Sequence, residues 1–149
     1  MPAEDDDGAA ALRAQARAWR DLKLAEAPQE PRALALWAQH AAGHILFERV
    51  RAAGLADIDP DLPAAERRHA ERAVDAAMYA LMMLIDGVSG GIHDGERAVV
   101  LRFLVDVMEG ERVTYSLDLG QGDGMCMGFH AWRDGDFGEH PVLAPSSDP

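Results

Sequence analysis

The segment Ala73–Ile85 constrains the fold more than any other part of the chain. Only Asp75 within it carries a charge, and Asp86-Gly87 follows directly. A helix that is apolar nearly all round must be buried on nearly all sides, and this one is too short to span a membrane. The segment therefore predicts a buried core helix around which the rest of a domain packs.

Three N-terminal helices are expected from periodic apolar residues and from the signals at their ends. They cover about residues 9–27, 31–53 and 62–86, and the last of them contains the core segment. Pro28 ends the first helix and Pro31 lies in the first turn of the second. Gly54 is expected just past the end of the second helix, and Gly87 just past the end of the third.

A β-hairpin is expected over residues 98–119. Two runs of residues with apolar side chains at alternate positions, 98–107 and 113–119, lie on either side of the turn signal Glu109-Gly110. Residues 98–107 also have an apolar helical face, so the alternation alone leaves strand and helix open, while the valine content favours strand. Residues 88–95 are expected to form a loop, and residues 125–132 a third strand or a short helix.

These elements predict an α+β fold in which the three helices pack on a small antiparallel sheet. One domain is expected over residues 9–143, with flexible tails at 1–8 and 144–149. A hairpin alone is marginal in water, so the core helix has to cover its apolar face. A homodimer that joins the sheets of two chains is a second way to protect the strand edges.

The charge of the chain is strongly negative and unevenly distributed. The net charge is −12, and residues 86–149 contribute −8 of it, from 12 acids and 4 bases. Such a field repels nucleic acids and anionic membranes and favours a protein partner with a basic surface. We therefore expect neither a nucleic-acid nor a membrane partner. The negative field also favours solubility, the more ordinary reason for an acidic surface.

The rest of the composition bears on origin and compartment. Cys126 is the only cysteine, so no intramolecular disulfide is expected, and the acidic N-terminus has no feature of a secretory signal. A cytoplasmic location follows as the expectation. Lys23 is the only lysine and asparagine is absent, a bias typical of GC-rich bacterial genomes.

A candidate metal site lies in the second predicted helix. His40, His44 and Glu48 follow at four-residue spacing, which puts them on one helix face. Two imidazoles and a carboxylate can bind a divalent ion such as Zn²⁺ or Fe²⁺. Alternatively, the two histidines only border the core beside Trp37. No cofactor is otherwise predicted.

A second candidate group belongs to the third predicted helix. Asp75, Tyr79 and Asp86 lie roughly on one side of it, and a carboxylate in an apolar pocket acquires a raised pKa suited to acid–base work. The alternatives for Asp75 are an ion pair with Arg68 or Arg72, or a hydrogen bond to Tyr79.

The third candidate group is the C-terminal loop. It combines two histidines, two acids and two aromatic residues: His130, Trp132, Asp134, Asp136, Phe137 and His140. Histidine with aspartate suits acid–base or metal chemistry, while exposed aromatic residues among acids suit a protein interface. A third interpretation is a structural turn, which ranks first here, before the interface and catalysis.

No nucleotide-binding or nucleophile motif is present, and an enzymatic role is not favoured. The leading hypothesis is a small bacterial protein that works without catalysis, covering a basic partner as an inhibitor or immunity protein covers a toxin. The second is a metal-dependent enzyme or metal-binding protein. The third is a small-molecule binder in which Asp75, Tyr79 and Trp132 converge between the core helix and the sheet.

Overall fold

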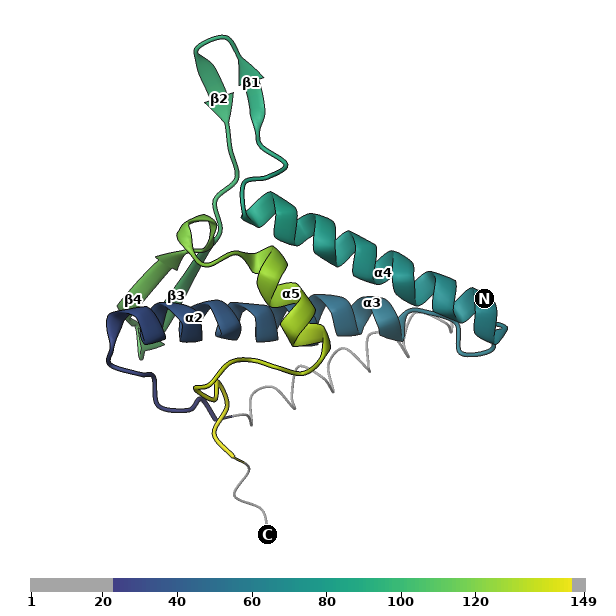
Figure 1. Cartoon of the computed structure of the whole chain (residues 1–149), viewed down its shortest axis with the longest axis horizontal. Helices are drawn as coiled ribbons and strands as arrows, with labels where there is room; N and C mark the ends of the chain where they lie inside the picture. Colours follow the sequence, from purple (N-terminus) through teal and green to yellow (C-terminus); the bar gives the residue numbers. More distant parts are fainter. Residues whose placement is uncertain (1–22, 146–149) are drawn as a thin grey trace.

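The computed structural model describes residues 23–145, which adopt an α+β fold (Figure 1). Helix α2 (Pro31–Leu46) continues through a π-helical turn, η1 (Phe47–Arg51), into α3 (Ala52–Ala56). Helix α4 (Ala64–Ile85) runs back along this rod, and the short helix α5 (Met125–Arg133) packs on both. The expected fold class is confirmed.

Helix α2 begins where the sequence predicts, because Glu30 and Pro31 define its start. The Glu30 carboxylate accepts hydrogen bonds from the backbone N–H groups of Arg32 (3.0 Å) and Ala33 (2.8 Å), two donors that a helix leaves unpaired. The predicted end at Ala53 is wrong, since the helical rod continues through Gly54 to Ala56. Gly54 stays helical at a close approach to α4, where an added Cβ would lie 3.1 Å from Val74 Cγ1.

Helix α4 ends as predicted, but it is not buried on nearly all sides. Its C-terminus is followed by Gly87 in the left-handed conformation (φ +75°). Its buried residues are Met78, Met82 and Ile85, whereas four alanines of the core segment, Ala73, Ala76, Ala77 and Ala80, are exposed. The expectation of an all-round buried helix is therefore wrong: within residues 23–145, α5, η1 and α3 cover one side of α4, and the other side is left open (Figure 1).

The strands form two separate hairpins and not one sheet. Strands β1 (Ile92–Asp94) and β2 (Arg97–Val99) pair with each other, and β3 (Leu104–Glu109) pairs with β4 (Arg112–Asp118) across the predicted turn at Gly110. The expected single strand over 98–107 is thus wrong, because the chain leaves one hairpin after Val99 and enters the other at Leu104. The expected loop 88–95 contains β1.

Residues 125–133 form helix α5, so the short-helix alternative is confirmed and the third strand is wrong. Gly124 precedes α5 and offers no side chain to cap it. The N-terminus of α5 is instead capped by Asp86, which directly follows α4 and is distant in the sequence. The Asp86 carboxylate accepts from the backbone N–H groups of Met125 (2.6 Å) and Cys126 (2.9 Å). An ionised acceptor is favoured at a helix N-terminus, so this contact fixes α5 against α4.

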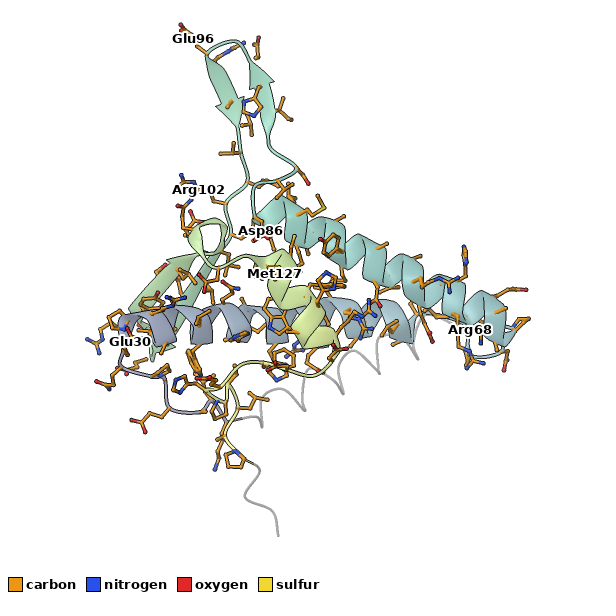
Figure 2. All side chains as sticks on the ribbon, in the orientation of Figure 1. Glu30, Arg68, Asp86, Glu96, Arg102 and Met127 are labelled. Atoms are coloured by element: carbon orange, nitrogen blue, oxygen red, sulfur yellow. The ribbon has the colours of Figure 1, made fainter. Side chains whose placement is uncertain are left out.

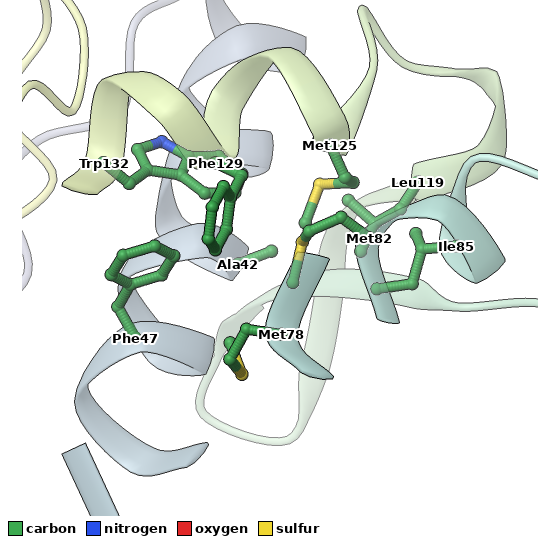
Figure 3. Packing of buried hydrophobic residues seen from close by; sticks show 9 residues of the cluster. All are labelled: Ala42, Phe47, Met78, Met82, Ile85, Leu119, Met125, Phe129 and Trp132. Carbon is green, nitrogen blue, oxygen red and sulfur yellow. The ribbon is translucent and has the colours of Figure 1, made fainter. Parts of the chain in front are cut away.

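Two apolar clusters hold these elements together. The larger one joins α2, η1, α4, α5 and the short 3-10 turn η2 (Leu119–Gln121). It is drawn in Figure 3 and contains Ala42, Phe47, Met78, Met82, Ile85, Leu119, Met125, Phe129 and Trp132. The smaller one contains Trp37, Ala38 and Val142, and the inner side chains of β3 and β4 pack against it. Helix α2 therefore separates the two clusters and contacts both.

The chain ends of the described part lie side by side. Leu24 forms an antiparallel bridge with Leu143, and the backbone N–H of Ala144 donates to Lys23 O (2.8 Å). Of the helix predicted for 9–27, residues 9–22 lie outside the described part, and residues 23–27 are not helical. The predicted tail 1–8 also lies outside it, as do residues 146–149 of the tail predicted at 144–149.

Candidate functional site

The C-terminal loop after α5 lies across the N-terminal half of α2. The indole N–H of Trp37 donates to the carbonyl oxygen of Pro141 (3.0 Å), and Val142 is buried in the smaller cluster. Gly138 sits against the His40 ring so closely that a Cβ there would overlap the imidazole. The loop is therefore held against α2, while its acidic side chains Asp134, Asp136 and Glu139 are exposed.

His40 links the loop to α5. The indole N–H of Trp132 donates to His40 Nδ1 (2.9 Å), and the two rings meet edge to face. An Nδ1 atom that accepts a hydrogen bond belongs to a neutral imidazole with its proton on Nε2. Burial lowers the pKa of His40, and the nearby carboxylate of Asp136 opposes that shift. Both observations indicate a neutral His40 near pH 7.

A pocket of about 380 Å³ opens between the start of α2 and this loop. Its lining combines apolar side chains, two histidines, two carboxylates and one arginine: Glu30, Arg32, Ala33, Leu36, Trp37, His40, Gly138, Glu139 and His140. We call it the loop pocket. Hydrogen bonds from the N–H groups of Arg32 and Ala33 lower the pKa of Glu30, so its carboxylate stays ionised well below neutral pH. Figure 2 labels Glu30 at this end of α2.

The predicted residues of the C-terminal loop separate into buried and exposed ones. Trp132 is only 2% exposed, so the expectation of an exposed tryptophan anchor is wrong. Its ring fits between Gly43 and Gly128, where a Cβ on either would overlap it. Phe137 is half-buried and stacks on Trp132. His140 lines the loop pocket, whereas His130 is exposed beside Tyr79, with ring centroids 5.6 Å apart.

Of the proposed metal ligands, His40 and His44 lie in α2 and contact aromatic rings, whereas Glu48 lies in the π-helical turn η1. His40 accepts from Trp132, and the His44 ring packs on Phe137 with centroids 4.7 Å apart. Within residues 23–145 no three His, Cys, Asp or Glu side chains converge as a metal-binding group, so Glu48 does not complete one with the two histidines. The metal site stays a prediction.

The candidate residues of α4 have structural partners. Asp75 forms an ion pair with Arg51 of η1 (2.6 Å) and not with the expected Arg68 or Arg72. Asp86 caps α5. Tyr79 packs on Phe129, with ring centroids 5.5 Å apart. Asp75, in contact with η1, lines a different surface pocket from the loop pocket, and neither pocket is lined by Tyr79 or Trp132.

Cys126 shows no sign of activation as a nucleophile. Burial raises the pKa of its thiol, and the neighbouring Asp86 carboxylate raises it further. A reactive cysteine needs the opposite environment, one that stabilises the thiolate. The side chain therefore serves the packing between α5 and α4.

Sequence reasoning missed Glu30, Glu139 and Gln39. Glu30 was detectable as an acceptor directly before a helix-starting proline. Gln39 is 3% exposed; its amide donates to Gly124 O (3.2 Å) and accepts from Asp123 N (2.9 Å), which ties α2 to the loop before α5. Nothing local in the sequence joins Glu30 to Glu139, because only the path of the C-terminal loop brings them to one pocket.

The comparisons with known proteins add no relative. Neither the family models, nor the curated proteins, nor the solved structures contain a match to this chain. Among residues 23–145, no helix combines the length and the apolar character needed to cross a bilayer.

Proposed function

We propose that this protein is a non-catalytic interaction module that covers a basic segment of another protein, in the manner of an inhibitor or immunity protein. The loop pocket receives a lysine or arginine side chain of that partner, and Asp134 and Asp136 contact neighbouring basic residues. The observation that carries the proposal is the meeting of Glu30 and Glu139 at one pocket, beside a firmly anchored acidic loop.

The chemistry of the loop pocket suits a long cationic side chain. Ala33 and Leu36 offer apolar surface to its methylene groups, which such residues bury while the charged end stays with polar partners. The carboxylates of Glu30 and Glu139 supply the opposite charge, and together they exceed the one positive charge of Arg32 in the same lining. A guanidinium can bond a carboxylate through two parallel N–H groups, so arginine is the better fit.

The charge of the whole chain supports the same class of partner. A net charge of −12 raises the encounter rate with a basic protein and suppresses encounters with acidic ones. The attraction between exposed charges is screened over about 8 Å at physiological salt. Binding of this kind is therefore expected to weaken steeply as salt is added.

A role as general base is not favoured for His40, which lines the loop pocket, or for Asp136 beside it, because both already accept structural hydrogen bonds. The Nδ1 atom of His40 accepts from Trp132, and Asp136 Oδ1 accepts from the backbone N–H of Gly138 (3.0 Å). A general base needs a free acceptor within hydrogen-bond reach of its substrate. These contacts instead make the surface rigid, which lowers the entropic cost of binding a partner.

The test uses a fluorescein-labelled peptide of six arginines separated by glycines as the probe. Its affinity is measured by fluorescence anisotropy at about 50 mM and about 200 mM NaCl for two double variants of equal charge change. Asp136→Asn with Glu139→Gln alters the loop, whereas Asp106→Asn with Glu111→Gln alters exposed acids of the β3–β4 hairpin. We expect the loop variant to lose about fivefold in affinity, or about 1 kcal/mol, and the hairpin variant less than twofold.

Equal losses in the two variants would contradict the proposal, because the peptide would then respond to net charge and not to the loop. Salt-independent binding would contradict it as well. Circular dichroism of both variants confirms that each is folded.

The volume of the loop pocket favours one alternative, a small-molecule binder. About 380 Å³ falls within the range of ordinary ligand pockets. The two carboxylates then point to a small amine or guanidine. A thermal shift of the free protein with arginine amide, lost in Glu139→Gln, would support this alternative over a protein partner.

A further inference from the structure

The first hairpin stands away from the rest of the described protein. Strands β1 and β2 project beyond the end of α4 (Figure 1), with Glu96 labelled at the tip in Figure 2. All six of their residues are exposed. We call residues 88–104 the apolar arm, because it carries six large apolar side chains that are 56–75% exposed: Val88, Ile92, Val99, Val100, Leu101 and Leu104.

The arm is specified by its own sequence. Ile92 and Val99 are directly opposite each other in the register, and Asp94 forms an ion pair with Arg97 across the turn. Gly95 takes φ +56° at the first position of the two-residue turn, where hairpins favour glycine. Gly91 allows close approach at the base, since a Cβ there would overlap the carbonyl oxygen of Val99.

An arm of this kind needs a partner. A two-stranded hairpin is marginally stable in water on its own, and each strand here has three residues. Both outer edges present unpaired backbone groups, which are templates for pairing with another strand. Exposed apolar side chains gathered on one projecting element are typical of an interaction site in soluble proteins.

The charge of the arm allows a second copy of the chain as its partner. Residues 88–104 contain two acids, Asp94 and Glu96, and two bases, Arg97 and Arg102, so the arm is neutral while the whole chain carries −12. Two copies that met through their bodies would repel each other, whereas two arms can meet without that cost. A basic partner would be drawn to the acidic body and not to the arm.

The exposed area suits a symmetric contact of ordinary size. Six side chains that are about two-thirds exposed, at roughly 100 Å² for each when fully exposed, present roughly 400 Å² of apolar surface. A standard interface buries about 800 Å² on each partner, a little more than half of it apolar. The arm therefore carries about as much apolar surface as such an interface uses, and pairing of the β2 edges covers the part of it that faces the partner.

We propose that two copies of the chain associate through their apolar arms, with the outer edges of the two β2 strands paired antiparallel about a two-fold axis. The product is a four-stranded sheet in which Ile92, Val99 and their counterparts form the apolar face. An isologous contact of this kind uses the same patch on both copies and closes at a dimer. The loop pocket takes no part in it, so either proposal can fail alone.

Sedimentation equilibrium of the full chain at about 1–200 μM tests the proposal with two matched variants. Val99→Glu places a charge on the arm, and Val113→Glu places the same charge on an exposed valine of β4 that is 48% exposed. We expect a wild-type dimer that dissociates in the micromolar range, at least tenfold weaker association for Val99→Glu, and no change for Val113→Glu. A wild-type monomer over the whole range would overturn the proposal, as would equal effects of the two variants.

Cross-linking provides a second, independent readout. In a Cys126→Ser background, Ala98→Cys puts a thiol in β2, and Ser116→Cys puts one on β4, where the residue is likewise exposed. Oxidation is expected to give a covalent dimer through position 98 and not through position 116. Equal cross-linking at both positions would contradict pairing through β2.

Discussion

Replacing Asp86 with alanine is expected to loosen helix α5 and to destabilise the whole fold. The carboxylate accepts two backbone N–H groups at the start of α5, at 2.6 and 2.9 Å, from the far end of α4. These are donors that the helix itself leaves unpaired. Since Met125, Phe129 and Trp132 of α5 belong to the larger apolar cluster, loss of the cap affects the packing as well.

The magnitude follows from the kind of contact. Losing an N-terminal cap costs about 0.5–2 kcal/mol, and a hydrogen bond to a charged group contributes about 1.5–3 kcal/mol. Water reaches part of this site, because Asp86 is half-buried, and it compensates for some of the loss. We expect Asp86→Ala to lower the free energy of unfolding by about 2–3 kcal/mol, and Asp86→Asn by about half as much, because an amide oxygen accepts only part of the original pair.

Urea unfolding followed by far-ultraviolet circular dichroism measures these changes. Asp94→Ala is the matched control, because it also removes a carboxylate in an ion pair, but one on an exposed turn, where such pairs contribute about 0–1 kcal/mol. An Asp86→Ala variant within about 0.5 kcal/mol of the wild type would refute the capping role. So would a loss no larger than that of the control.

Three further perturbations test other contacts. Because burial lowers the pKa of His40 in the folded protein, the unfolded chain takes up this proton first as the pH falls below about 6.5. The free energy of unfolding should therefore fall with acid, and it should fall less in His40→Asn, whose Oδ1 can still accept from Trp132. Parallel pH profiles of the two proteins would argue against this. Gly43→Ala should lower the free energy of unfolding by about 1–2 kcal/mol, since overlap with Trp132 outweighs the gain of about 1 kcal/mol in helix propensity. Gly54→Ala should leave the free energy of unfolding unchanged. A stabilised Gly43→Ala would show that the indole can move. Gln39→Leu should cost about 1–3 kcal/mol in the same assay, because it leaves Asp123 N and Gly124 O without their partner, and an unchanged midpoint would mean that water replaces the amide.

Much of the fold could be predicted because local signals decide it. Pro31 fixes the start of α2, Gly87 follows the end of α4, and Glu109-Gly110 forms the turn of the second hairpin. The division of residues 98–107 could not be predicted. An alternating pattern is the same whether a strand pairs with residues 92–94 or with residues 112–118. The pattern therefore does not show that pairing with residues 92–94 stops at Val99 and that pairing with residues 112–118 begins at Leu104.

The candidate site was predictable only in part, for a related reason. The acids of the C-terminal loop are evident in the sequence, but the meeting of one of them, Glu139, with Glu30 in one pocket depends on the path of the chain. Trp132 appeared exposed because acids and glycines follow it. Its burial depends on Gly43 and Gly128, which leave room for the indole from two different helices, and a contact between distant helices has no local signature.

Titration of the ¹⁵N-labelled full chain with the arginine–glycine peptide, followed by amide chemical shifts, tests whether the loop pocket and its acidic loop receive a basic segment. We expect the largest shifts within residues 30–40 and 134–140, all following one saturable curve. Shifts spread evenly over all exposed acids, or concentrated on the apolar arm, would contradict it.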